Sequence, residues 1–256
     1  MQDINVNSAE FNLAQDIARF SNPLHKALYR RIQTEKAILP FELLGRTLAY
    51  NPYPPRFKEV FSGLESIRAI CISCFDYEHL EKICAFNANL IILDVARDEE
   101  AKPRCEGLEC VGYLRHYTNA LIVIKDCFID SYQVLQAVVY GADGVMFNTE
   151  SIALKELLAF AFRLGLMAFV EVTNLKEIKQ AVLAKAEGFY LPNECFEELH
   201  PIIPKRKCLC TNIKERYCLE SNQSESDIAH LFDLGVPSKS LQATRADFAF
   251  AHIEVI

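Results

Sequence analysis

Short apolar runs alternate with amphipathic stretches over most of the chain, beginning near residue 68. The apolar runs are rich in β-branched residues and recur at roughly the length of one βα unit. They predict strands at 69–73, 90–95, 121–124, 144–147, 168–172, 188–191 and 207–210. Helical spacing predicts helices between them, at 75–86, 107–117, 131–140, 151–164, 174–185, 194–200 and 226–234.

This alternation, kept through seven units, favours an α/β fold of the (β/α)8 TIM-barrel type over an open doubly wound sheet. No Gly-x-Gly-x-x-Gly motif follows any predicted strand, which weakens the dinucleotide-binding alternative. The eighth strand has two candidate positions. Either the polar segment 238–242 is the strand and 246–256 a final helix, or 248–256 is itself the strand.

The first 67 residues have a different pattern. Helical spacing covers 8–20, with Ser8 as a candidate N-cap, and recurs at 24–38 and 41–49. The proline-rich segment 51–56 follows and suits only an extended connector. We therefore predict a helical extension and connector at 1–67 and a barrel at 68–256, together forming one structural domain.

Composition narrows the function classes. The net charge of −7 over 256 residues argues against a nucleic-acid partner. No apolar run reaches transmembrane length, and the polar start 1–10 is not typical of a signal peptide. Ten cysteines without a secretory segment indicate reduced cytosolic thiols. These features predict a cytoplasmic protein that binds neither membrane nor nucleic acid, and nothing in the sequence points to a cofactor.

Lys125 is the first candidate catalytic residue. The apolar run 121–124 ends abruptly on Lys125 and Asp126, and an amphipathic helix follows. In a parallel barrel, this is how a buried strand brings a reactive group to the carboxyl-terminal face. The plainer interpretation is a lysine that ends a strand and reaches water.

Several motifs resemble one known family. The chain is similar to the indole-3-glycerol phosphate synthases, the (β/α)8 carboxy-lyases of tryptophan biosynthesis. The motifs that carry the resemblance are the connector 44–53, Lys125-Asp126 with Ile129-Asp130 and Tyr132-Gln133, Gly141-Ala142-Asp143, Leu164-Gly165-Leu166 and Val170-Glu171-Val172.

The resemblance implies a lyase that closes the indole ring. A carboxyphenylamino-deoxyribulose phosphate cyclises, loses carbon dioxide and then loses water, which requires a general acid and a base. By the resemblance, Lys125 is the general acid and Glu171 the base, and Asn193 and Thr211 stand among the substrate-binding positions. Asp126 and Asp130 are expected to cap or orient loops, and Tyr132 and Gln133 to serve packing and capping.

Other family positions are changed. Cys71 and Ser73 replace a glutamate and a lysine of strand one, and the loop that follows that strand in the family is deleted. Glu194 replaces an arginine after strand six. Cys210 and Asn212 replace the carboxylate and glycine of strand seven, and the strand-eight glycine aligns with Gln242 or His252. Because cations and a backbone phosphate cradle are missing, we predict weak substrate binding and impaired catalysis.

Two other functions remain open. The chain could be a pseudoenzyme that binds a protein partner or another small ligand; a barrel mouth filled by Phe75, Phe147, Phe169 or Tyr190 would favour this. Alternatively, Lys125 could perform new chemistry, such as Schiff-base formation with a carbonyl substrate. Cys71, Cys74 and Cys210 could form a metal or thiol site, but we expect small buried hydrophobes and no metal. His200 and His230 are expected at the surface or at helix ends.

Overall fold

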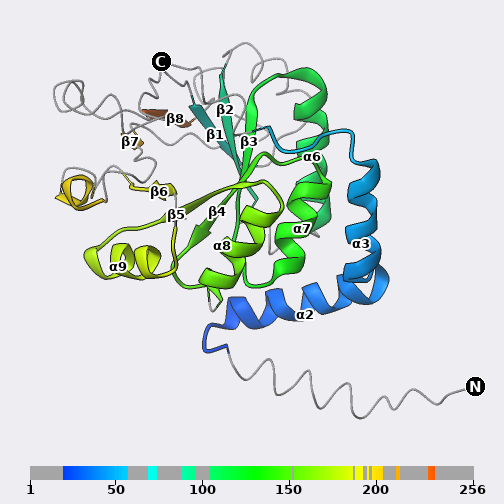
Figure 1. Ribbon diagram of the computed structural model, residues 1–256, viewed down its shortest axis with the longest axis horizontal. Helices are drawn as coiled ribbons and strands as arrows, with labels where there is room; N and C mark the ends of the chain where they lie inside the picture. The colour runs from blue at the N-terminus through cyan, green and yellow to red at the C-terminus, as the bar shows by residue number, and fades with distance from the viewer. Residues whose placement is uncertain are drawn as a thin grey trace, which may run out of the picture.

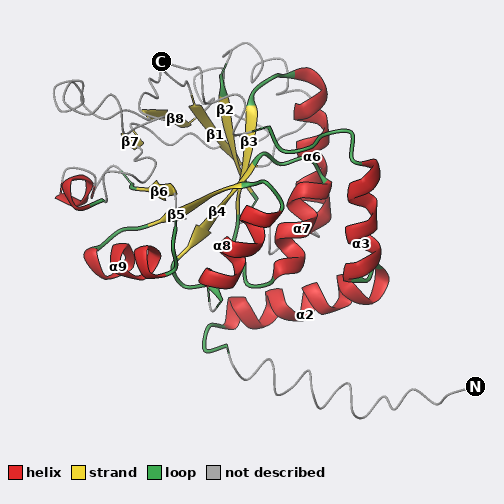
Figure 2. Ribbon diagram, viewed as in Figure 1, coloured by secondary structure: helices red, strands yellow, loops and turns green. Residues whose placement is uncertain are grey.

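In a computed structural model of the chain, the described residues are 20–56, 69–73, 88–95, 104–151, 153–186, 188–192, 195, 198–203, 212–213 and 230–233. For 69–73, 104–106, 200, 212–213 and 230–233 the description covers the backbone alone. Strands fan through the centre and helices lie along their outer side (Figure 1). Figure 2 shows the same view by type of secondary structure.

Six parallel strands form the main sheet in chain order. They are β1 (Ala69–Ser73), β2 (Leu90–Asp94), β3 (Leu121–Lys125), β4 (Gly144–Asn148), β5 (Met167–Glu171) and β6 (Gly188–Tyr190). Each pairs in parallel with the next. All six lie at the predicted positions to within two residues at either end. Consecutive parallel neighbours joined by helices are the repeating unit of a (β/α)8 barrel, the predicted fold class.

The connecting helices bury the outer face of this sheet. They are α6 (Arg104–Tyr117), α7 (Ser131–Val139), α8 (Leu154–Arg163) and α9 (Leu175–Leu183). Alternate strand residues, such as Ile122, Ile124 and Phe147, share one core with apolar residues of these helices. Because side chains alternate along a strand, the residues between them face the other side, the interior of the sheet. This places the last residue of each strand from β2 to β6 on the interior face.

The N-terminal extension packs against α7. It consists of α2 (Pro23–Ile38), α3 (Phe41–Thr47) and the 3-10 turn η1 (Leu48–Tyr50), which lie outside the sheet's helix layer (Figure 1). The Asn22 side chain caps α2, and Pro23 occupies its first turn. A second core joins the two parts through Phe20, Leu28, Ile32, Leu44, Cys127, Ile129, Tyr132 and Leu135. The helices predicted at 24–38 and 41–49 are confirmed, whereas the one at 8–20 lies almost wholly outside the described residues.

Polar contacts across this interface add to the apolar core. Lys36 Nζ lies 2.7 Å from Asp130 Oδ2, and the Tyr132 hydroxyl donates to the Leu39 carbonyl at 2.9 Å. The Gln136 amide donates to Glu35 at 2.8 Å. Asp130 also caps α7, in a capping box with Gln133. The latter half of the Lys125 motif therefore anchors the extension, which confirms the packing and capping roles predicted for these residues.

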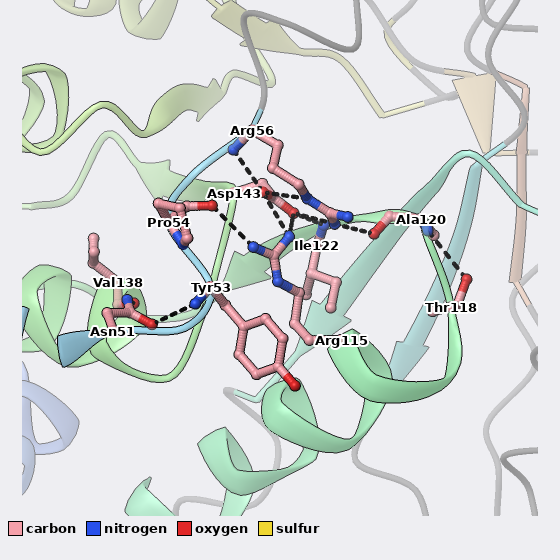
Figure 3. A network of polar contacts seen from close by, with 10 residues as sticks. All are labelled: Asn51, Tyr53, Pro54, Arg56, Arg115, Thr118, Ala120, Ile122, Val138 and Asp143. Carbon is pink, nitrogen blue, oxygen red and sulfur yellow. Dashed lines mark hydrogen bonds and ion pairs between the residues drawn. The ribbon is translucent and has the colours of Figure 1, made fainter.

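Asp143 joins the connector to the amino-terminal ends of β3 and β4 (Figure 3). Its carboxylate is fully buried and accepts from the Ile122 N–H at 2.9 Å. Arg115 Nη1 lies 2.9 Å from both carboxylate oxygens, and Arg56 donates through its backbone N–H and its guanidinium. Burial lowers the pKa of Arg115, an effect that the neighbouring Asp143 opposes. We refer to Asp143, Arg115 and Arg56 as the carboxylate clamp.

Gly141 allows the connector to approach this clamp. Its φ is +99°, a conformation that L side chains rarely adopt. A Cβ there would lie 3.1 Å from the Cβ of Tyr53. Arg115 stacks over the Tyr53 ring at 5.2 Å and donates to the Pro54 carbonyl at 2.9 Å. The Gly141-Ala142-Asp143 motif therefore serves the amino-terminal end of the barrel, opposite to Lys125.

The described residues after 203 differ from the prediction. The helix expected at 226–234 is wrong, because β8 (His230–Asp233) is a strand that runs antiparallel to β1. β7 (Asn212–Ile213) pairs antiparallel with β8. A short apolar run is compatible with either a helix or a strand by its periodicity alone. Pairing with the edge of β1 makes this segment a strand. Both candidate positions for the eighth strand, and 207–210 for the seventh, lie outside the described residues.

Candidate active site

The site begins at the carboxyl-terminal end of β3. β3 is buried along its first four residues and ends on Lys125, whose side chain is 19% exposed. The outward neighbours Ile122 and Ile124 belong to the helix-facing core, so Lys125 faces the sheet interior. The backbone N–H of Val95 donates to the Lys125 carbonyl at 3.0 Å and holds the strand end in place. The sequence pattern thus located the strand end that carries this lysine.

Glu171 meets Lys125 across the intervening strand β4. The Lys125 ammonium donates to Glu171 Oε1 at 3.2 Å, and the glutamate side chain is 22% exposed. The two residues are 46 positions apart in the sequence. An ammonium beside a carboxylate, partly shielded from water, supplies a proton donor and a proton acceptor within reach of one ligand. The structure therefore brings the two predicted catalytic residues together.

Aromatic rings lie on the same interior face. Glu171 pairs in register with Tyr190, which is 1% exposed. Lys125 Nζ lies 5.4 Å from the centroid of the Tyr190 ring, within the range of a cation–π contact. Phe169 pairs with Gly188, where a Cβ would come within 2.8 Å of the Phe169 ring. Because Gly188 has no side chain, the Phe169 ring can approach β6 closely on the amino-terminal side of Tyr190.

The four aromatic residues considered for the mouth separate into three groups. Phe169 and Tyr190 face the interior. Phe147 belongs to the helix-facing core and contacts Phe128, with ring centroids 5.0 Å apart. Phe75 lies outside the described residues. The interior beside the Lys125–Glu171 pair is therefore partly lined by aromatic rings.

The ends of β2 to β6 form a polar row on the interior face. Their last residues are Asp94, Lys125, Asn148, Glu171 and Tyr190. This row contains two acidic side chains and one basic side chain. Among the strand ends whose side chains the structure describes, Lys125 is therefore the one cation available to an anionic ligand.

The loop after Lys125 is held by its own side chains. Asp126 is buried and accepts from the Cys127 N–H at 2.7 Å. Gln133 accepts from the Ile129 N–H at 2.7 Å and donates to the Cys127 carbonyl at 2.9 Å. Ser151 donates to the Phe128 carbonyl at 2.7 Å, linking the loop to the segment after β4. The loop-orienting role predicted for Asp126 is confirmed.

Other predicted site residues are not placed. Asn193, Glu194, Cys74, Cys210 and Thr211 lie outside the described residues, and Cys71 and His200 are described by their backbone alone. His230 lies in β8 and not at a helix end. Among the described side chains, no group of three or more His, Cys, Asp or Glu could hold a metal ion. In the same part of the chain, no helix is long and apolar enough to span a membrane.

The fold and this residue pair define a class of protein: a βα-barrel with an acid–base pair at the carboxyl-terminal ends of its strands. Comparison with known proteins specifies the family. The model of the family "Indole-3-glycerol phosphate synthase" matches residues 108–225. The indole-3-glycerol phosphate synthase of Campylobacter hominis is 33% identical over 213 residues, covering 70% of this chain and 78% of the relative. The enzyme of that name from Campylobacter jejuni is 28% identical over 231 residues, covering 80% and 86%.

The chain belongs to the indole-3-glycerol phosphate synthase family, as its motifs predicted. Its fold class is that of the family, a (β/α)8 barrel. Among solved structures, a thiamine phosphate pyrophosphorylase from Pyrococcus furiosus is similar over 59% of this chain and 76% of its own length, with 21% identity and a TM-score of 0.44.

The sequence did not predict the contact between Tyr190 and Lys125. Tyr190 was considered only as an aromatic residue that could fill the mouth. The available signal was its position near the end of the predicted strand 188–191, two residues after Gly188. The partner across the sheet depends on register, which the local pattern does not contain.

Proposed function

We propose that this chain is an indole-3-glycerol phosphate synthase-type carboxy-lyase with low catalytic efficiency. Lys125 is the general acid at the ketone of a carboxyphenylamino-deoxyribulose phosphate, and Glu171 the base for dehydration. The observation that carries the proposal is the 3.2 Å contact between these two groups at the strand ends. Family membership supports the reaction class, and the free thiols of the described residues Cys110, Cys127 and Cys195 support a cytoplasmic location.

The low efficiency follows from charge. The substrate carries a carboxylate and a phosphate, whereas the described row of strand ends offers one ammonium beside two carboxylates. In the sequence, the cations of strand one and strand six are replaced by Ser73 and Glu194. Each lost charge-assisted contact weakens binding by about 1.5–3 kcal/mol. Several such losses reduce the affinity for substrate by about 10³-fold or more.

Asn193 and Thr211 complete the proposal as substrate-binding residues. They follow the sixth and seventh strand positions of the sequence pattern, where polar groups can contact the substrate. Their uncharged side chains can hydrogen-bond a carboxylate or a phosphate but cannot neutralise it.

The test is a steady-state fluorescence assay for indole-3-glycerol phosphate formation. We expect kcat/KM about 10³-fold below that of the Campylobacter hominis enzyme. The Lys125→Ala and Glu171→Gln variants should lose a further 10²- to 10⁴-fold or so, the usual contribution of a general acid or base. Lys155→Ala, which removes an exposed lysine of α8, should leave the rate unchanged. A rate equal to that of the relative would disprove the impairment.

One observation favours a second function, a non-catalytic barrel. The Phe169 and Tyr190 rings occupy interior positions next to the acid–base pair. A pseudoenzyme that binds a protein partner or another small ligand would show neither turnover nor substrate binding in the same assay. Schiff-base chemistry on Lys125 would instead be detected by borohydride trapping of a carbonyl ligand.

A further inference from the structure

The Lys125 ammonium contacts two side chains, those of Glu171 and Tyr190. The register of β5 and β6 aligns Glu171 with Tyr190, so both side chains project from the same interior face. The ammonium lies 3.2 Å from the carboxylate and 5.4 Å from the ring centroid. The ammonium of a flexible four-carbon side chain thus contacts both a carboxylate and an aromatic face.

The tyrosine ring is itself firmly placed. It is 1% exposed, and its neighbours Phe189 and Leu191 point into the helix-facing core. On the amino-terminal side of Tyr190, the Phe169 ring packs closely against Gly188 on the same interior face. A buried ring between packed neighbours keeps one orientation, whereas a partly exposed ion pair alone allows a lysine several rotamers.

We propose that Tyr190 is a positioning residue for Lys125, whose ring stabilises the protonated ammonium beside Glu171. This inference rests on the proposed function, because the ammonium is the form that donates a proton to the substrate ketone. It gives Tyr190 a role opposite to blockage of the site, because the ring acts on the charge of Lys125.

The experiment measures how fast Lys125 is acetylated by acetic anhydride, with mass spectrometry of the labelled peptides and Lys155 as the internal reference. Only the neutral amine reacts. The rate near pH 8 therefore reports both charge and access, and the rate near pH 11 chiefly access. We therefore compare the rate near pH 8 divided by the rate near pH 11. This ratio falls when the charged form of Lys125 is stabilised and rises when that stabilisation is lost. No substrate is present, so the result does not depend on whether the chain closes an indole ring.

Replacing Tyr190→Leu removes the π face, and we expect the rate ratio for Lys125 to rise about two- to tenfold, the amount that a partly desolvated cation–π contact provides. Tyr190→Phe keeps the face and should preserve the ratio. Phe189→Leu is the matched control, because it truncates an equally buried ring of the same strand that points away from Lys125.

An unchanged ratio in folded Tyr190→Leu protein, or an equal rise in Phe189→Leu, would overturn the proposal. Where turnover is measurable, Tyr190→Leu should lower kcat more than it raises KM, and Tyr190→Phe should retain the rate. A gain in rate on truncation would overturn it too, and would identify the ring as an obstruction of the site.

Discussion

At the scale of single residues, the most consequential side chain outside the candidate site is Asp143. Its buried carboxylate receives the Ile122 N–H and two guanidinium groups at the amino-terminal end of the strands. Charges removed from water remain stable only when every partner is in place. Another acidic residue, Glu171 at the opposite end of the strands, is partly exposed and, among the described residues, forms an ion pair with Lys125. Burial therefore separates a structural carboxylate from a candidate catalytic one.

We expect Asp143→Asn to destabilise the fold by about 3–5 kcal/mol, because it leaves the buried Arg115 guanidinium without its counter-charge. Urea unfolding followed by circular dichroism measures the loss. Arg56→Ala should cost less, since Arg56 is 27% exposed and Arg115 still neutralises the carboxylate. Equal stability of Asp143→Asn and the unchanged chain would show that the clamp contributes little.

At the scale of elements, α7 connects the candidate site with the N-terminal extension. It begins after the loop that follows Lys125, and its outer side receives α2 and α3. Asp130 takes part in both, since it caps α7 and pairs with Lys36 of α2. The motif that carries the family resemblance therefore combines one candidate catalytic residue with several that assemble the fold.

Replacing Asp130→Ala should destabilise the chain by about 1–2 kcal/mol, through loss of the α7 cap and of the contact with α2. Lys36→Met, which removes only the ion pair, should cost at most about 1 kcal/mol. Asn174→Ala removes the comparable side-chain cap of α9 and serves as the control in the same unfolding experiment. If Asp130→Ala costs less than Asn174→Ala, the cap at α7 is not a fold determinant.

At the scale of the whole molecule, we propose that the extension and the barrel are one cooperative domain, divided in sequence at residues 67 and 68. The apolar core of Leu28, Ile32 and Leu44 against α7 fixes the extension on one side. The carboxylate clamp fixes its connector on another. Two separate attachments of this kind oppose independent release of the extension.

Two buried cysteines test this cooperativity without any substitution. Cys127 lies in the core beneath the extension, and Cys110 lies in the core between α6 and the sheet. Pulsed thiol labelling across a urea series should give the same midpoint for both. Labelling of Cys127 at lower urea than Cys110 would mean that the extension separates before the barrel unfolds.

Local sequence pattern was sufficient to predict several parts of this protein. Continuous apolar runs placed the strands from β1 to β6, because a parallel strand covered by helices is buried on both faces. Apolar spacing near 3.6 residues placed α2, α3 and the helices from α6 to α9, because each of these helices buries one face. The motifs around Lys125, Gly141 and Glu171 determined the family. Capping chemistry determined the roles of Asp126, Asp130 and Gln133.

Contacts between groups that are distant in sequence depend on the folded molecule. The strand at 230–233 exists because β1 offers it an edge, and no local period distinguishes it from a helix. The pairing of Asp143 with Arg115 and Arg56, and the position of the Tyr190 ring against Lys125, depend on strand register and on how the connector crosses the sheet ends. Register is set by the packing of the whole core, so contacts that depend on it become visible only in the folded molecule.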